Sequence, residues 1–203
     1  MSRITRIPAR TRFAPSPTGR THLGSGRTAL YNYLLARQTG GQFILRIEDT
    51  DQKRFVPGAE EELIESLHWL GLSWDEGPDV GGPYGPYRQS ERLDIYQKYA
   101  RQLIESGNAY YCFCKQFDEI KGARRGAKHR DECISYDLRL AESIERIASG
   151  ESFVVRFRMP DRGSITAVDA LRGPIEVENS SLDDTILVKS DGFPVYHFRC
   201  GHL

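Results

Sequence analysis

The sequence contains no long apolar run, no secretory leader and no excess of charge of either sign. No window approaches the ~18 apolar residues that a membrane span needs, and no apolar segment follows the basic N-terminal residues, as a secretory signal would require. The 28 basic and 28 acidic residues balance, which argues against coating nucleic acid through a general positive field. With 39% hydrophobic residues, we expect a soluble, cytoplasmic globular protein without a membrane segment.

Cysteine is also scarce, and three of the four cysteines fall within a short stretch. Cys112-x-Cys114 is followed by His129-x-x-x-Cys133. Three thiolates and one imidazole form a Cys₃His set that suits tetrahedral zinc. The alternative is a group of free, buried cysteines, and Cys200 is not expected to be a ligand. In either case, the pattern favours a reducing compartment rather than disulfides.

The first 71 residues alternate between extended and helical segments. A strand is expected at 11–14, a helix from Gly24 to Gly40, a strand at 43–47 and a helix that begins at Pro57 and ends at Gly71. This order is typical of a parallel α/β sheet. A third helix is expected at 90–105. The apolar positions predict the buried face of the second helix, made of Leu63, Ile64, Leu67 and Leu70.

The pattern changes after Gly107, where cysteines, basic residues and short extended segments appear. Strands are expected at 153–158 and 185–188, and an extended segment at 194–198. We therefore divide the chain into residues 1–107, the first half of a nucleotide-binding domain; 108–191, an inserted α+β subdomain; and 192–203, a return to the first domain. Basic residues cluster within the insertion, either as a solvated loop or as an RNA contact, at Lys121, Arg124, Arg125, Lys128 and Arg130.

A proline-stiffened loop connects the first strand to the first helix, between Arg12 and Gly26. A helix N-terminus attracts anions through its dipole and its unpaired amides, which suits a nucleotide phosphate. Gly24 and Gly26 would let the backbone approach such a ligand, and His22 could donate a hydrogen bond as charge develops in a transition state. The alternative is a tight strand-to-helix connection without a ligand.

Four stretches in order resemble the glutamyl-tRNA synthetases. Pro15-Ser16-Pro17-Thr18-Gly19 followed by His22-x-Gly24 is similar to that family's form of the HIGH motif of class I enzymes. The other matches are the stretches 43–51, 85–92 and 189–198, and together the resemblance covers about residues 10–198. It implies the first half of a class I Rossmann-type parallel sheet with an inserted subdomain that binds the tRNA acceptor stem.

The resemblance also implies roles for individual residues. Arg12 is expected to pair with the side-chain carboxylate of glutamate, Glu48 to accept its α-ammonium group, and Tyr196 to close the pocket. Without the resemblance, Arg12 and Glu48 would be read as surface ion pairs and Tyr196 as a core residue. The implied glutamate site comprises Arg12, Ala14, Ser16, Glu48 and Tyr196. The implied ATP site comprises Ser16, Thr18, His22, Gly24 and Ser25, with His22 and Gly24 as catalytic residues.

The implied reaction has two steps. Glutamate attacks the α-phosphorus of ATP, which is bound with Mg²⁺, and the resulting glutamyl-adenylate is transferred to tRNA(Glu). The alternatives are a short paralogue that glutamylates a queuosine-modified tRNA, and a non-catalytic remnant that binds tRNA. The family is usually monomeric, and structural zinc is expected at the Cys₃His set.

After Phe198 the chain departs from the family pattern and reads Arg199-Cys200-Gly201-His202-Leu203. The second half of the nucleotide-binding domain and its lysine-rich loop do not follow. We therefore expect the chain to be an incomplete catalytic part with an exposed apolar sheet edge. On this reading, the isolated polypeptide should be poorly stable and show little or no aminoacylation.

Overall fold

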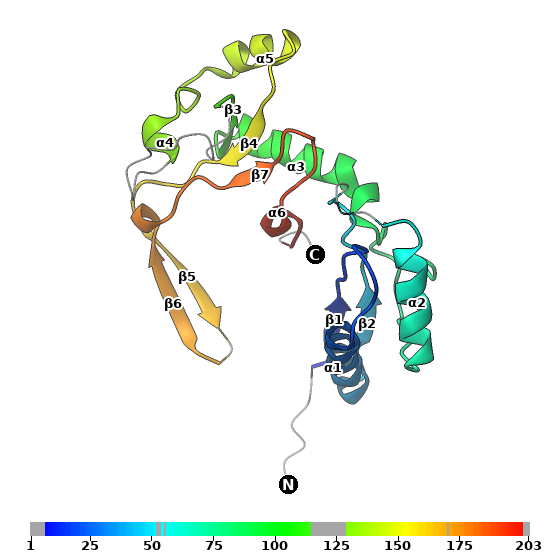
Figure 1. The fold of residues 1–203 in the computed structure, drawn as a ribbon. Helices are drawn as coiled ribbons and strands as arrows, with labels where there is room; N and C mark the ends of the chain where they lie inside the picture. The colour runs from blue at the N-terminus through cyan, green and yellow to red at the C-terminus, as the bar shows by residue number, and fades with distance from the viewer. Residues whose placement is uncertain (1–6, 52–53, 55, 115–128, 170, 201–203) are drawn as a thin grey trace. The chain divides into compact units, whose positions relative to one another are not determined.

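The computed structural model describes residues 7–51, 54, 56–114, 129–169 and 171–200. The chain divides into two compact units, Met1–Leu93 and Asp94–Leu203, and each is described by itself (Figure 1). Within the described residues, no helix has both the length and the apolar character needed to cross a membrane. The basic cluster at 121–128 lies outside the described residues.

The first unit is built on parallel strand pairing. Strand β1 (Arg10–Phe13) pairs in parallel with β2 (Gln42–Leu45), and α1 (Leu23–Thr39) connects them. Single parallel bridges, Ile44 to Glu76 and Ile47 to Arg88, extend this pairing. The predicted alternation of strands and helices is therefore confirmed, and the class is α/β.

Helix α1 ends as predicted. Gly40 adopts the left-handed conformation (φ 69°), and its amide donates a hydrogen bond to Arg37 O in the last turn. The residues that α1 buries are small: Gly26, Ala29 and Ala36. Leu30 and Leu34, which follow helical spacing in the sequence, are exposed. The small residues allow the helix to lie close to β1 and β2, and Phe43 and Tyr33 complete the contact edge to face.

Helix α2 (Ala59–Trp69) begins after Gly58 rather than at Pro57, with three glutamates in its first turn. Leu63 and Leu67 are buried and Ile64 packs partly against the same core, as predicted. The prediction for Leu70 was wrong, because its side chain is 45% exposed. The helix ends at Trp69, so Leu70 leaves the buried face and lies near Gly26 of α1 instead.

A buried carboxylate connects β1 to the loop at 80–87. Glu76 accepts hydrogen bonds from the Arg10 guanidinium and the Tyr87 hydroxyl. Arg10 also lies over the ring of Tyr84, 4.5 Å from its centroid. The hydrogen bond from Arg10, opposed by burial, holds the pKa of Glu76 below its ordinary value of 4.5.

The second unit is α+β. It begins within α3 (Leu93–Glu105), which follows the helix η1 (Gln89–Arg92) of the first unit. The buried residues Tyr96, Ala100 and Ile104 of α3 pack on an antiparallel sheet. The sheet has the order β3 (Ala109–Cys112), β4 (Val154–Phe157) and β7 (Ile186–Val188). The strands predicted at 153–158 and 185–188, and the helix predicted at 90–105, are thus confirmed, except that the first turn of that helix is 3-10.

The segment at 194–198 was predicted to be extended, and this was wrong. Pro194 makes one antiparallel bridge to Val188, and the short helix α6 (Tyr196–Cys200) then begins. Arg199 N bonds Val195 O at 3.2 Å, which closes the helical turn. Phe198 is thereby directed onto Tyr96 of α3, and that aromatic contact overrides the apparent strand pattern.

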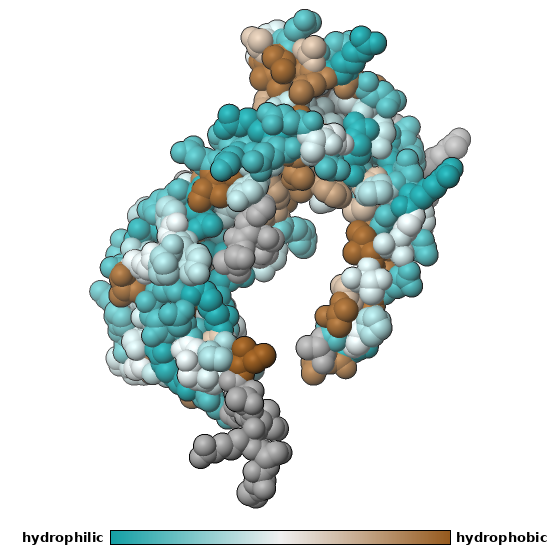
Figure 2. All heavy atoms as spheres, turned by 180° about the vertical axis from the view of Figure 1, so that it is seen from behind, coloured by the Kyte–Doolittle hydropathy of each residue, from teal (hydrophilic) through white to brown (hydrophobic). Residues whose placement is uncertain are grey.

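The remaining elements are α4 (His129–Glu132), α5 (Leu140–Ala148), β5 (Ser164–Asp169), β6 (Gly173–Glu178) and η3 (Asn179–Ser181). Strands β5 and β6 form a hairpin whose residues are nearly all exposed. One face carries Ile165, Ala167, Ile175 and Val177. Apolar side chains are accordingly visible along this hairpin in Figure 2. The domain limits expected from the sequence (1–107, 108–191 and 192–203) stay a prediction.

We predict that Leu67→Ala lowers the free energy of unfolding by about 2–5 kcal/mol, because Leu67 is fully buried and the truncation leaves a cavity. Leu70→Ala on the same helix should cost about 1 kcal/mol or less, because that side chain is half exposed. Denaturant unfolding of both variants tests this pair. Equal losses would contradict the assignment of the buried face.

We also predict an acid-dependent contribution from Glu76. Its pKa is depressed in the folded chain, so the stabilisation is present above the pKa of the unfolded chain and is lost as the pH falls through the lower folded value. Glu76→Gln should therefore destabilise the chain at pH 7 and flatten the decline in stability below about pH 4.5. Plots of the free energy of unfolding against pH should not run parallel for Glu76→Gln and the parent. The exposed Glu65→Gln is the control, and its plot should run parallel to that of the parent.

Candidate functional site

The loop between β1 and α1 positions a histidine at the start of the helix. His22 is the N-cap residue, with extended backbone (φ −107°, ψ 162°), and its Nδ1 accepts a hydrogen bond from Gly24 N at 3.1 Å. A neutral imidazole that accepts at Nδ1 carries its proton on Nε2. That nitrogen lies 3.5 Å from Ser25 Oγ. His22 therefore caps the helix with one nitrogen and presents the other as a donor.

Gly24 is required by this cap. A Cβ at position 24 would lie 2.9 Å from the His22 ring, so any side chain would displace the imidazole. The amides of Ser25 and Gly26 bond His22 O at 2.9 and 3.4 Å. Three of the first four amides of α1 are thus engaged by His22 itself, so the helix dipole and the His22 side chain supply most of the attraction for an anion.

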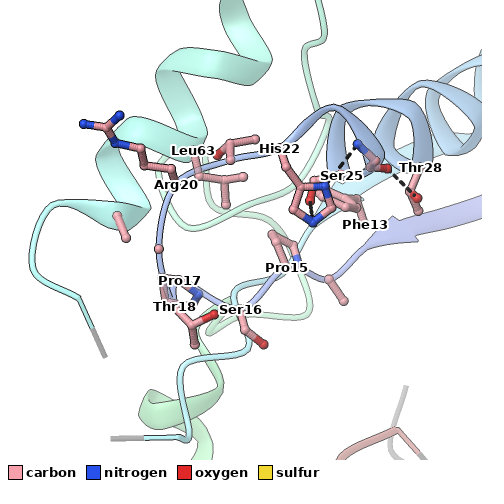
Figure 3. A pocket seen from close by; sticks show the side chains of 15 residues that line it. Phe13, Pro15, Ser16, Pro17, Thr18, Arg20, His22, Ser25, Thr28 and Leu63 are labelled. Atoms are coloured by element: carbon pink, nitrogen blue, oxygen red, sulfur yellow. Dashed lines mark hydrogen bonds between the residues drawn. The ribbon is translucent and has the colours of Figure 1, made fainter. Parts of the chain in front are cut away.

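These residues line a pocket of about 420 Å³. The structure brings together here all five predicted ATP-binding residues and Ala14 of the predicted glutamate site. Figure 3 shows His22 and Ser25 side by side at the helix start, while Arg20 extends away from them. None of the described residues that line the pocket is acidic. A pocket whose titratable groups are Arg20 and His22 suits a polyanion such as a nucleotide.

Glu48 lies just beyond the end of β2 and is tied to the same loop, because its amide bonds Pro15 O at 2.8 Å. Its carboxylate is buried. Oε1 accepts hydrogen bonds from Arg46 Nε and Nη2 at 3.1 and 3.0 Å, and from Gln89 Nε2 at 3.1 Å. Both members of the Arg46–Glu48 ion pair are only 3% exposed. The alternative of a solvent-exposed ion pair at this strand end therefore does not apply to Glu48.

Arg12 lies on the same face of the sheet as Glu48. Phe13, Leu45 and Ile47 point into the core beneath α1, so the alternating residues Arg12 and Glu48 face the other side. The register places Arg12 beside Ile44. Its Nη1 is buried and has no hydrogen-bond partner among the described residues. An unsatisfied buried guanidinium nitrogen is costly, and a carboxylate ligand would satisfy it.

Tyr196 belongs to the second unit, at the start of α6, and it is exposed. Its predicted place in the glutamate pocket stays a prediction. Arg12 and Glu48 do not line the pocket around His22. The structure thus places the predicted residues of the first unit in the loop pocket and, for Arg12 and Glu48, on one face of the sheet.

The predicted metal ligands converge in the second unit. Cys112, Cys114, His129 and Cys133 each offer a ligand atom, and these atoms all lie within 4.8 Å of one another. The distances are 3.7 Å between the sulfurs of Cys112 and Cys133, 3.5 Å between those of Cys114 and Cys133, and 3.2 Å from Cys112 Sγ to His129 Nε2. Bonds of about 2.3 Å to a tetrahedral zinc would separate sulfurs by about 3.8 Å, so the residues fit such an ion.

Neighbouring residues hold the cluster in place, and the sequence pattern did not predict them. The Asp183 carboxylate accepts from His129 N at 3.0 Å, and Ser135 Oγ accepts from Phe113 N at 3.0 Å. Arg130 is buried and donates to Met159 O, to Asp161 and to Leu182 O. The member of the basic cluster that the structure describes therefore has a structural role next to the metal ligands.

The thiols share hydrogen bonds that shift their pKa values in opposite directions. The hydrogen bond with Cys133 lowers the pKa of Cys112, and the same bond, together with burial, raises the pKa of Cys133 to about 12. Burial raises the pKa of Cys114. A metal that binds thiolates must therefore displace protons from this cluster.

Sequence reasoning also missed Arg46, Gln89 and Ser90 as parts of the site. Gln89 and Ser90 lie in the stretch 85–92, which the sequence had singled out without assigning it a role. Ser90 donates to Asp49 from its amide, at 2.8 Å, and from its hydroxyl. The available signal was the co-occurrence of this stretch with the acidic strand end at 48–51.

Comparison with known proteins agrees with this geometry. Residues 8–201 match the family described as "tRNA synthetases class I (E and Q), catalytic domain". The glutamate–tRNA ligases of Cellvibrio japonicus and Clostridium kluyveri are each 52% identical over 193 residues, which is 93% of this chain and 38% and 40% of theirs. The chain thus spans about two fifths of the length of these relatives.

Solved structures give the same result. The chain superposes with a TM-score of 0.81 and 45% identity on a glutamate–tRNA ligase from Elizabethkingia meningosepticum in complex with its amino acid, covering 95% of this chain and 40% of that one. The glutamate–tRNA synthetase from Elizabethkingia anophelis gives the same score and identity. From the strand pairing, the histidine-capped helix and these similarities, we conclude that the chain belongs to the class I tRNA synthetase (E and Q) catalytic-domain family.

Proposed function

We propose that the chain supplies the glutamate- and ATP-binding part of a glutamate–tRNA ligase that acts in the cytoplasm. The observation that carries this proposal is the His22 cap, which presents Nε2–H in a pocket whose described lining residues include no acidic side chain. The same unit also holds a buried Arg12 guanidinium nitrogen and a buried Glu48 carboxylate on one face of its sheet. The substrates are L-glutamate, ATP with Mg²⁺, and tRNA(Glu). Residues 1–107 and 192–203 form the catalytic part, and 108–191 contact the acceptor stem.

In the first step, an α-carboxylate oxygen of glutamate bonds to the α-phosphorus of ATP, and the bond from that phosphorus to the bridging oxygen breaks to release pyrophosphate. Arg12 holds the side-chain carboxylate of glutamate and Glu48 its ammonium group, which orients the attacking oxygen. His22 donates from Nε2 to a phosphate oxygen as negative charge develops there. Ser16, Thr18 and Ser25 supply hydroxyl groups along the nucleotide.

In the second step, a ribose hydroxyl at the end of the tRNA attacks the carbonyl carbon of glutamyl-adenylate. The bond from that carbon to the phosphate oxygen breaks, AMP leaves, and the phosphate of AMP takes up the proton of the hydroxyl. No side chain of the chain needs to form a covalent intermediate, so positioning and charge neutralisation account for the catalysis.

Glutamate-dependent ATP–pyrophosphate exchange by the full-length gene product, with and without tRNA, tests this function. His22→Ala should lower the exchange rate by about 10²–10³, as loss of a transition-state donor does. Arg12→Ala should raise the KM for glutamate and leave the KM for ATP unchanged. The controls are the exposed residues His68→Ala and Arg101→Ala, which should keep the parent rate. Binding of acceptor-stem RNA without exchange in any condition would instead identify a non-catalytic RNA-binding protein.

We further propose that Cys112, Cys114, His129 and Cys133 hold a structural zinc ion. The support is the convergence of their ligand atoms, the anchoring of His129 by Asp183 and the absence of disulfides at the three described cysteines. The ion would cross-link β3 to α4, and so stabilise the insertion rather than take part in the reaction.

The zinc proposal predicts about one zinc per chain after reconstitution, with protons released on binding. Cys112→Ser or Cys133→Ser should lose the metal and melt at a lower temperature, while Cys200→Ser should keep both properties. Elemental analysis measures the zinc content, and thermal unfolding with and without a chelator measures the melting temperature. A parent chain that binds no zinc, and melts identically with the chelator, would contradict the proposal.

A further inference from the structure

Two consecutive residues attach the segment at 87–90 to the acidic strand end, and the residue before them attaches it to α2. Arg88 donates to the Glu60 carboxylate of α2 at 2.9 Å, Gln89 donates to Glu48 Oε1 at 3.1 Å, and Ser90 donates to Asp49. The backbone of the segment is also paired, because Ile47 N bonds Tyr87 O at 2.9 Å and Gln89 N bonds Ile47 O at 3.0 Å. These main-chain hydrogen bonds therefore fix the position of Gln89 independently of its side-chain contacts.

The Gln89 side chain is fully buried. A buried amide that lacks partners is costly, so the hydrogen bond to Glu48 restrains both side chains. Arg46 Nε and Nη2 reach the same oxygen, Oε1. Three donors on one oxygen hold the carboxylate plane in a single orientation.

The chemistry of the two donors differs in a way that matters for a cationic ligand. Arg46 neutralises much of the Glu48 charge, and a second cation in place of Gln89 would repel an ammonium group. The carboxamide of Gln89 adds a donor without adding positive charge. It can therefore fix the orientation of Glu48 while the carboxylate keeps its attraction for a cation.

We propose that Gln89 is a positioning residue for the amino group of the substrate, acting through Glu48. This rests on the proposed function, in which Glu48 binds the α-ammonium group of glutamate. Because the carboxylate is already oriented, binding does not have to order it. Gln89 thus contributes to the selection of an α-amino dicarboxylate over a dicarboxylate of the same length that lacks the amino group, such as glutarate.

The test compares Gln89→Met with Gln38→Met in the full-length gene product. The first substitution removes the buried amide, and the second makes the same change at an exposed position of α1. Kinetics give the KM for L-glutamate, the KM for ATP, kcat and the inhibition constant of glutarate. Gln89→Met should raise the KM for glutamate about tenfold, as expected for loss of a hydrogen bond to a charged group. The KM for ATP and the inhibition constant of glutarate should stay within about twofold of the parent values.

A merely structural role would move all these constants together, and that result, or an unchanged KM for glutamate, would overturn the proposal. If Gln89→Met fails to fold by circular dichroism, Gln89→Asn takes its place. The shorter side chain withdraws the amide from Glu48 without adding charge, and it should likewise weaken glutamate binding selectively. Arg12→Ala separates a contact with the side-chain carboxylate from the positioning role of Gln89, because it should weaken the binding of glutamate and of glutarate alike. A parent protein with no glutamate-dependent exchange would instead refute the proposed function itself.

Discussion

The parallel pairing of β1 with β2 determines where the candidate substrate-binding side chains of the first unit lie. The register sets Phe13 beside Leu45 and Arg12 beside Ile44. The hydrogen bond from Glu48 N to Pro15 O extends the pairing into the loop. A slip of one residue would exchange the core face for the ligand face. Burial of the apolar side chains therefore also specifies the positions of Arg12 and Glu48.

The pairing of β1 with β2 sets the direction of the loop that follows β1. The loop ends at His22, where α1 begins. His22 uses Nδ1 to cap α1, which leaves Nε2 for a ligand and makes Gly24 necessary. The same residue thus stabilises the helix start and supplies the candidate catalytic donor. Because a capped helix begins at one residue only, the position of the imidazole is set by the fold rather than by the ligand.

Much of this was predictable from local signals. Glycines marked the helix ends, and apolar spacing identified Leu63 and Leu67. The Cys-x-Cys and His-x-x-x-Cys pattern located four side chains that converge in space. Such signals are local, because a helix turn or a ligand pair within four residues follows from backbone geometry alone.

The errors and omissions have a common physical cause. Leu70 and the segment at 194–198 were misjudged because tertiary contacts, to Gly26 and from Phe198 to Tyr96, decide their conformations. Gln89 and Asp183 were missed because their partners, Glu48 and His129, lie 41 and 54 residues away in the sequence. A hydrogen bond across such distances leaves no periodic trace in the sequence. Its only signal was the co-occurrence of motifs.

The most direct test of the account is a crystal structure of the gene product with L-glutamate and a non-hydrolysable ATP analogue. The account predicts the side-chain carboxylate of glutamate at Arg12, its ammonium group about 3 Å from the Glu48 carboxylate, and a phosphate oxygen at His22 Nε2. Glutamate bound away from both Arg12 and Glu48, or a nucleotide that leaves His22 without contact, would contradict it.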